Sequence, residues 1–383
     1  MSLDLISDYV NIPLVDESKH LLTGFDITDS RLYITGSQIL IRGRIMIMSE
    51  KMRAAMIVGK RQFEIQEVPM PEMSDDEMLV KVEACGVCTS DMAGYLGTHS
   101  EEVMARMPYP RRVGHEPAGT VVEVGKNVKG FEVGDRVTGI FGGGAMAEYV
   151  TCAPYDTTMR GHGVMVGKIP DGIPIEHAIG EPMMCLSSIS RTTCPEFGDT
   201  IFQVGAGFMG LGVIAGVATR QVKEYIVADL EDWRLDVAKE LGATITLNPN
   251  KCNVVEEVMK ITEGKGVDIA IEVVGHPPSM KMVGDVIKTN RGKIIAVGWH
   301  QAPDTYELMS WIKSPVIYSP QGIGYSADPK SELPRALWAI KNGIFPMDKL
   351  ITHTYKLEEI GTAFEDNLDR TPGYIKGVVM PFK

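Results

Sequence analysis

Two stretches of the 383-residue chain carry side chains that bind metal ions. The first holds Cys85 and Cys88 in a Cys-x-x-Cys spacing with Ser90 close behind, and the second is His115–Glu116. Thiolate and imidazole are good zinc ligands, and a carboxylate can complete or flank such a site. The same spacing occurs in zinc ribbons and redox proteins, but the other cysteines form no second pair and no thioredoxin-like context is present. Taken alone, His115 would more often be a structural histidine than a ligand.

A glycine-rich turn predicts a dinucleotide-binding site. The sequence Gly205-Ala206-Gly207-Phe208-Met209-Gly210 is a G-x-G-x-x-G pattern between a predicted strand and a predicted helix. Its glycines make the turn, let a pyrophosphate reach the backbone and let helix pack on strand. Asp229 ends the next predicted strand, where an acid would hold the ribose hydroxyls and repel a 2′-phosphate. We therefore expect Gly205, Gly207, Phe208, Met209, Gly210 and Asp229 to bind a cofactor, NAD in preference to NADP.

The elements around this turn alternate between strand and helix from residue 194 to residue 325. Strands are predicted at Thr200–Val204, Glu224–Ala228, Thr244–Leu247, Val267–Val274 and Lys293–Val297. Helices are predicted at Leu211–Arg220, Asp232–Leu241, Val254–Thr262 and Ser279–Thr289. Repeated β-α units imply a doubly wound parallel sheet, so this part of the chain is predicted to be an α/β domain.

The flanking regions follow other patterns. Residues 53–193 predict a barrel-like all-β module, because short strands alternate there with Gly, Pro and Asp breakers. Its predicted strands are Ala54–Val58, Met78–Cys85, Gly119–Val124 and Arg136–Ile140. The tail predicts helices at Glu332–Lys341 and Glu358–Leu368 and a strand at Gly377–Met380. Residues 1–52 differ from the rest and predict two strands, Arg31–Thr35 and Gln38–Met48; this N-terminal extension is assigned no chemistry.

Several motifs occur in a fixed order along the chain. They are Gly114-His115-Glu116-Pro117-Ala118-Gly119 with Gly125 and Val128, then Gly134-Asp135-Arg136-Val137, the glycine-rich turn and Val297-Gly298. Together they resemble the zinc-containing alcohol dehydrogenases of the medium-chain dehydrogenase/reductase family, from about residue 53 to the C-terminus. The resemblance implies a GroES-like β-barrel catalytic domain at residues 53–193, completed by residues 326–383. It also implies a Rossmann NAD-binding domain at residues 194–325, with the active site in the cleft between the two.

The resemblance further implies roles for the metal-binding side chains. Cys88 and His115 are expected to bind one catalytic zinc ion. Glu116 and Glu181 are expected to be a ligand and a nearby carboxylate, either of which can exchange with water. Ser90 stands at the family's proton-relay position, and Asp91 where a carboxylate orients the ligand histidine.

The resemblance also implies roles for other residues. Val274, Val297 and Gly298 are expected to bind the cofactor, the last two beside the nicotinamide. Cys85 matches a family cysteine that is not a ligand. Lys376 is either close to the pyrophosphate or a solvated surface lysine.

Two departures from the family pattern matter. Relatives with a second, structural zinc carry four closely spaced cysteines after Gly-Asp-Arg-Val, and none follows Gly134-Asp135-Arg136-Val137 before Cys152. The histidine that ends the proton relay in some relatives would fall at Ala93. We therefore expect one zinc ion per chain and a different exit for the proton.

The predicted activity is reversible transfer of a hydride between an alcohol and NAD, with zinc acting as a Lewis acid on the alcohol oxygen. Glu181-Pro182 resembles the polyol (sorbitol-type) branch, which favours a polyol, sugar alcohol or cyclitol as substrate. A simple alcohol or threonine remains open. Two further alternatives are a zinc-free quinone or enoyl reductase of the same fold and a non-catalytic cofactor-binding or redox-sensing protein.

Composition limits the partners. Acidic residues outnumber basic ones by 50 to 38, a net charge of −12, which argues against nucleic acid and anionic membranes. No apolar run is long enough to span a membrane, no secretory signal is visible, and six cysteines are too few for a disulfide scaffold. We expect a cytoplasmic protein. Members of the family that the chain resembles usually associate through the edge strand of the cofactor domain. Val316–Tyr318, flanked by prolines, is a plausible edge strand, so the resemblance implies a homodimer or homotetramer.

Overall fold

The computed structural model describes residues 33–35, 38–41, 44–47, 51–141, 143–154, 166–299, 312–320 and 329–383. The chain divides into two compact units, Met1–Ser49 and Glu50–Lys383. In the first unit, β1 (Tyr33–Thr35), β2 (Gln38–Ile41) and β3 (Arg44–Ile47) form a three-stranded antiparallel sheet. The single strand predicted at Gln38–Met48 is therefore two strands.

The first part of the second unit is built from two sheets. One has the order β5-β4-β7, and the other has the order β11-β9-β8-β6-β19-β18 with β10 also paired to β6. Their strands are β4 (Lys51–Gly59), β5 (Gln62–Pro69), β6 (Met78–Gly86), β7 (Arg111–Arg112), β8 (Pro117–Val124), β9 (Arg136–Gly139), β10 (Tyr149–Cys152), β11 (Val166–Lys168), β18 (His353–Lys356) and β19 (Gly377–Met380). Between them lie the short helices η1 (Thr89–Asp91), α2 (Met92–Leu96), α3 (Glu101–Arg106) and η2 (Ile175–His177).

The C-terminal segment completes this β module. Strand β19 pairs antiparallel with β6, which sets Val378 opposite Gly86. Helix α12 (Ile360–Asp369), which follows η4 (Leu357–Glu359), contributes Ile360 and Phe364 to the same buried cluster as Val80 and Val121 of the sheet. The core of this module is therefore shared between its two ends in sequence.

Residues 200–318 contain a six-stranded parallel sheet of order β14-β13-β12-β15-β16-β17. Its strands are β12 (Thr200–Val204), β13 (Glu224–Ala228), β14 (Ile245–Leu247), β15 (Ile269–Glu272), β16 (Lys293–Ala296) and β17 (Val316–Tyr318). The order reverses beside β12, as in the doubly wound dinucleotide-binding fold. The predicted fold class, a Rossmann domain combined with a β-barrel domain, is confirmed.

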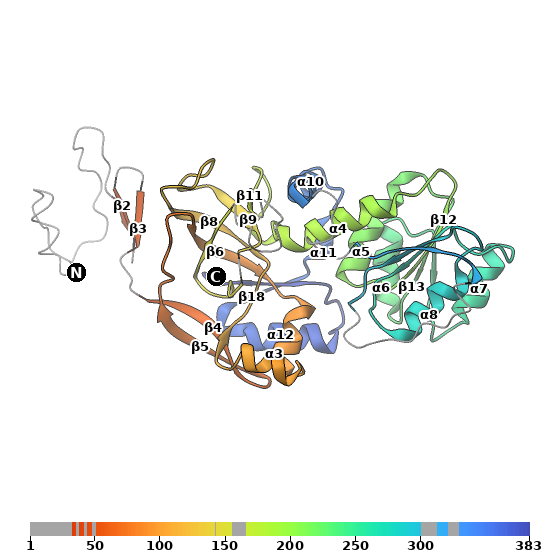
Figure 1. Ribbon diagram of the computed structural model, residues 1–383, viewed down its shortest axis with the longest axis horizontal. Helices are drawn as coiled ribbons and strands as arrows, with labels where there is room; N and C mark the ends of the chain where they lie inside the picture. Colours follow the sequence, from red (N-terminus) through yellow and green to blue (C-terminus); the bar gives the residue numbers. More distant parts are fainter. Residues whose placement is uncertain are drawn as a thin grey trace, which may run out of the picture. The chain divides into compact units, whose positions relative to one another are not determined.

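Helices cover both faces of this sheet (Figure 1). They are α5 (Phe208–Val217) with η3 (Ala218–Arg220), α6 (Asp232–Glu240), α7 (Val254–Ile261) and α8 (Pro277–Val286). Successive strand residues point to opposite faces, so Ile201 packs in the cluster that contains α5 and α6 while Phe202 packs with α7 and α8. Because the central strands are buried on both faces, most of their residues are apolar.

Helix α4 (Gly180–Thr193) was not predicted. It packs on α5 and on α10 (Pro329–Lys341), and α11 (Met347–Leu350) packs on α5 beside it. A methyl group at Gly212 of α5 would overlap the Leu186 side chain of α4, so glycine permits the close approach of the two helices. Nearly all of α4 is buried, and its first turn carries Glu181.

Among the residues that the structure describes, no helix has both the length and the apolar character needed to cross a membrane.

Candidate active site

The pairing of β6 with β8 brings the two metal-binding stretches together. In this register Cys85 lies opposite Pro117, so Cys88, just after β6, and His115–Glu116, just before β8, meet at one end of the sheet. The Cys88 Sγ, a His115 ring nitrogen and a Glu116 carboxylate oxygen all lie within 4.8 Å of one another. A thiolate, an imidazole and a carboxylate around one point are a suitable donor set for a catalytic zinc ion, which keeps one position open.

Ser90 and Asp91 surround these ligand atoms. The Ser90 Oγ lies 3.2 Å from the Cys88 Sγ and 3.3 Å from the His115 Nε2. The Asp91 Oδ1 lies 3.2 Å from the His115 Nδ1, which leaves Nε2 directed at the metal-binding point. Burial alone lowers the pKa of the imidazole, but hydrogen bonds with Asp91 and Cys88 raise it to about 12. Zinc binds the neutral imidazole, so zinc binding at His115 would release any proton that the ring holds.

Glu116 forms a buried ion pair with Lys376. The Lys376 Nζ lies 2.8 Å from Oε1 and 2.7 Å from Oε2 of Glu116, and both residues are at most 5% exposed. Burial lowers the pKa of Lys376, but the Glu116 charge outweighs this effect and raises the pKa well above its usual range. Gly86 permits the arrangement, because a methyl group there would overlap the Glu116 carboxylate. From the sequence, Lys376 was expected either close to the pyrophosphate or on the solvated surface. The buried ion pair with Glu116 corresponds to neither expectation.

Glu181 and Cys85 lie near the site, and burial raises the pKa of both side chains. Burial, reinforced by the charge of Glu116, raises the pKa of Glu181 to about 7. Its carboxylate is not among the three groups that cluster within metal-ligand distance in the described part of the chain. Burial raises the pKa of the Cys85 thiol well above its usual range, so this cysteine stays protonated and is unsuited to bind a metal ion.

The glycine-rich turn has the shape that a pyrophosphate needs. Gly205 has a φ of +104°, which favours glycine, and a methyl group at Gly210 would overlap the Gly205 carbonyl oxygen. Gly207, at the start of α5, faces open space: among the described residues other than its chain neighbours, a Cβ built there comes within 4 Å only of the Arg234 Nη1, at 3.9 Å. Phe208 and Met209 begin the helix, whose N-terminus attracts phosphate.

Asp229 follows β13 beside this turn. Its Oδ2 accepts a hydrogen bond of 2.7 Å from the Ala206 amide and its Oδ1 one of 3.0 Å from the Glu231 amide. Arg234, buried on α6, donates from Nη2 to the Tyr374 carbonyl oxygen at 3.3 Å. Its guanidinium thus connects α6 to the C-terminal segment instead of lying free in solvent.

Three more predicted residues follow the central strands at their carboxyl ends. Val274 comes just after β15 and is 45% exposed, while Val297 and Gly298 come just after β16. Trp299, 67% exposed, lies beside them and was missed by the sequence analysis, as was Glu272 at the end of β15. A lone acid in an otherwise apolar strand was the available signal for Glu272.

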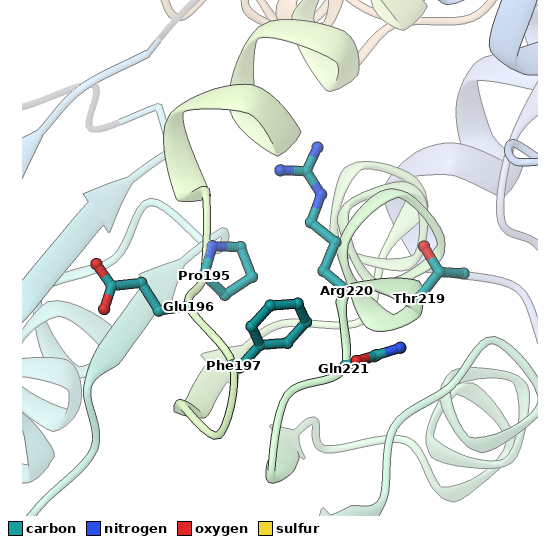
Figure 2. A pocket seen from close by; sticks show the side chains of 6 residues that line it. All are labelled: Pro195, Glu196, Phe197, Thr219, Arg220 and Gln221. Atoms are coloured by element: carbon teal, nitrogen blue, oxygen red, sulfur yellow. The ribbon is translucent and has the colours of Figure 1, made fainter.

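A pocket of about 660 Å³ lies elsewhere, lined by Pro195, Glu196, Phe197, Thr219, Arg220 and Gln221. Figure 2 shows Phe197 on the loop that leads into β12 and Arg220 on the segment opposite. This is the amino end of β12, whereas parallel sheets bind ligands at their carboxyl ends. The chemistry-bearing residues described above lie away from this pocket, and we assign it no catalytic role.

Both the β module and the dinucleotide-binding domain match known protein families. The alcohol dehydrogenase GroES-like domain matches residues 74–162, and the zinc-binding dehydrogenase domain matches residues 209–332. L-threonine 3-dehydrogenase of Pyrococcus horikoshii is 30% identical, over 83% of this chain and 96% of that protein. Sorbitol dehydrogenase of Bacillus subtilis is 28% identical, over 87% and 98%. The crystal structure of 2R,3R-butanediol dehydrogenase from Bacillus subtilis has a TM-score of 0.73 at 27% identity, covering 86% of this chain and 99% of that one.

Proposed function

Since this chain belongs to the zinc-containing alcohol dehydrogenase family, whose members act on CH–OH groups, we propose that it oxidises a polyol or other vicinal diol with NAD. The observation that carries the proposal is the cluster of Cys88, His115 and Glu116 with the Ser90 hydroxyl against two of its ligand atoms. When bound, zinc would supply a Lewis acid for the alcohol oxygen and NAD a hydride acceptor.

The chain's own residues then have distinct tasks. Cys88, His115 and Glu116 would hold the metal ion, and Asp91 keeps the His115 ring in the orientation that presents Nε2. Ser90 would accept the hydroxyl proton of the substrate, because its Oγ reaches the space in front of the ligand atoms. With Ala93 at the end of the family's usual relay, the proton would leave through water or a ribose hydroxyl.

Asp229 supports the choice of NAD. Its carboxylate lies at the end of β13 beside the glycine-rich turn, where it would bind ribose hydroxyls and repel a 2′-phosphate. Arg234 is the nearby cation that could bind such a phosphate, but it is buried and bonded to Tyr374. We predict a higher kcat/KM with NAD than with NADP and a smaller preference in Asp229→Ser. A wild-type preference for NADP would contradict this role of Asp229.

The substrate class rests on the relatives and on Glu181-Pro182. Sorbitol and 2R,3R-butanediol both carry neighbouring hydroxyls, and L-threonine carries an amino group beside its hydroxyl. A turnover panel of polyols, 2R,3R-butanediol, L-threonine and simple primary alcohols, read by NADH absorbance, tests the proposal. Preference for polyols or diols supports it, and preference for L-threonine or for a simple alcohol would overturn the substrate class.

Two alternatives make different predictions. A zinc-free quinone or enoyl reductase would reduce its substrate with a nicotinamide cofactor after all metal had been removed. A cofactor-binding protein without catalysis would bind NADH and turn over nothing in the panel. The intact ligand set and the Ser90 hydroxyl favour the dehydrogenase over both.

We also propose assembly through β17 and a cytoplasmic location. The three residues of β17 lie at the edge of the six-stranded sheet with Val316, Ile317 and Tyr318 all exposed, which would suit pairing with a second copy into a dimer or tetramer. Light scattering at micromolar concentration tests this, and a monomeric mass would contradict it. The need for Cys88 as a free thiolate supports a reducing compartment.

A further inference from the structure

The side chain of Glu272 is a buried carboxylate, and the proposed function assigns it no role. It is the last residue of β15 and has no exposed surface. Transfer of a carboxylate from water into a protein interior is costly unless hydrogen bonds compensate it. The hydrogen bonds of Glu272 therefore show what the residue holds in place.

Those bonds join two separate loops. The Glu272 Oε1 accepts from the Val274 amide at 2.8 Å, the Gly275 amide at 2.9 Å and the Ser279 Oγ at 2.6 Å. Its main-chain carbonyl accepts from the Val297 amide at 2.8 Å and the Gly298 amide at 3.0 Å. One residue thus bonds the loop after β15 through its side chain and the loop after β16 through its backbone.

The two loops are packed backbone against backbone at this point. A methyl group at Gly298 would overlap both the Gly275 amide and the Glu272 Oε2, and one at Gly275 would overlap the main chain of Trp299. Gly275 also has a φ of +78°, which favours glycine. The Glu272 side chain consequently lies against the contact between the loops, so a change in its shape or charge must move them.

The outer side of this contact presents apolar groups to solvent. Val274 is 45% exposed and Trp299 is 67% exposed, at the carboxyl end of the sheet where its ligands bind. Val274 also touches the glycine-rich turn, because its Cγ2 would lie 2.9 Å from a Cβ built on Gly205. An apolar surface beside the pyrophosphate site suits the nicotinamide ring, which is joined to the pyrophosphate through one ribose.

We propose that Glu272 is a positioning residue that fixes the two loops against which the nicotinamide ring of the cofactor lies. The proposal rests on the proposed function, since it presumes that NAD binds. The charged acceptor makes stronger hydrogen bonds to the Val274 and Gly275 amides than a neutral one would. The adenosine and pyrophosphate contacts expected at Asp229 and Gly207 lie outside the two loops that Glu272 bonds.

Glu272→Gln tests this with NADH and ADP-ribose, which differ by the nicotinamide ring. The glutamine keeps the shape and one acceptor oxygen but loses the charge. We expect the dissociation constant for NADH to rise about tenfold while that for ADP-ribose changes less than about twofold. The fluorescence of bound NADH should also shift toward that of free NADH. Ser279→Ala, a milder change at the same bonds, should alter both readouts in the same direction.

Glu332→Gln is the matched control. Glu332 is another buried carboxylate, bonded to the Ser187 hydroxyl at 2.6 Å and to Arg191, and it lies on α10 away from the cofactor turn. Its loss should lower thermal stability and leave the ratio of the NADH and ADP-ribose affinities unchanged. An equal loss of affinity for NADH and for ADP-ribose in Glu272→Gln would overturn the positioning role. If Glu272→Gln does not fold, the same equal loss in Ser279→Ala would overturn it. Wild-type protein that binds neither ligand would overturn the proposed function itself and this assignment with it.

Discussion

The Glu116 carboxylate has two possible partners, the Lys376 ammonium and a metal ion, and it is too deeply buried to remain without either. Both of its oxygens face Lys376 at 2.7–2.8 Å, and the same carboxylate belongs to the three-residue metal cluster. Removal of one partner from a buried ion pair leaves an uncompensated charge, which costs about 3–5 kcal/mol. The lysine therefore matters most while the metal site is empty.

Lys376→Met tests this exchange of partners. In the presence of a chelator the substitution should lower the free energy of unfolding by about 3–5 kcal/mol. With saturating zinc the loss should be much smaller, since the carboxylate then has a cation beside it. Urea denaturation under both conditions measures the difference. Lys349→Met is the control: Lys349 pairs with Glu240 at 2.8 Å on the surface, and its loss should cost at most about 1 kcal/mol with or without zinc. Equal losses for Lys376→Met in both conditions would show that Glu116 does not change partner.

Ser90→Ala should separate proton transfer from binding. Zinc content and NAD affinity should stay the same, because Ser90 supplies neither the ligands nor the glycine-rich turn. Turnover should fall by about 10²-fold or more, the scale on which a positioned proton-transfer group contributes. Ser90→Thr, which keeps the hydroxyl, should retain most of the activity. Turnover that is unchanged in Ser90→Ala at neutral pH would mean that the hydroxyl is structural.

Single residues were predicted from the sequence where local spacing carries the information. Cys88, Ser90 and His115 belong to short motifs, and the structure brings them together. The ion pair of Lys376 was not predictable, because Glu116 lies 260 residues away in sequence and only the folded sheet joins them. Glu272 was included in a predicted strand without a role, since four of its partners are backbone amides that any sequence would supply and a fifth is the Ser279 hydroxyl, seven residues away.

The elements of the Rossmann domain show why their boundaries could be predicted. Strands β12 and β13 begin and end at the predicted residues, because each is a short β-branched or apolar run between polar or glycine breakers. The same holds for β19 in the β module. Helix α4 lacked a comparable signal. Its three serines and Thr193 are buried together with its methionines, so no apolar stripe distinguishes one face. Tertiary packing on α5 and α10, which a local pattern does not contain, explains its formation.

The close contact within the turn between β12 and α5 leads to a prediction about the position of helix α5. In Gly210→Ala the added methyl group overlaps the Gly205 carbonyl oxygen, so the helix must move away from the turn. NADH affinity should fall at least about tenfold, as isothermal titration would measure. Gly361→Ala in α12 is the matched control, and NADH binding should not change. Outside its own stretch of helix, no atom of the described residues lies within 4 Å of the added Cβ. Normal affinity in Gly210→Ala would contradict the assignment of this turn to the pyrophosphate.

For the whole molecule we predict one zinc ion per chain. A structural zinc site needs four protein ligands, and the described residues contain a single cluster of three, at Cys88, His115 and Glu116. Elemental analysis of freshly purified protein should give one equivalent, and a chelator should remove it to leave a folded, inactive chain. Two tightly held ions would contradict the stoichiometry. Full activity in a metal-free preparation would contradict the proposed mechanism.

The pairing of β19 with β6 also affects the order in which the β module can form during synthesis of the chain. A ribosome delivers the chain from its N-terminus, so β6, β8 and β10 emerge long before β19, which pairs with the end of β6 at Cys85 and Gly86. The dinucleotide-binding domain is synthesised in between and can fold first, as domains generally do. Until residues 353–380 appear, the end of β6 at Cys85 and Gly86 lacks its partner strand, and unpaired strand edges promote aggregation. Lys376 arrives in the same late segment, so a metal ion captured earlier meets a Glu116 that has no competing ammonium. Translation order thus favours loading of the metal before the ion pair can form.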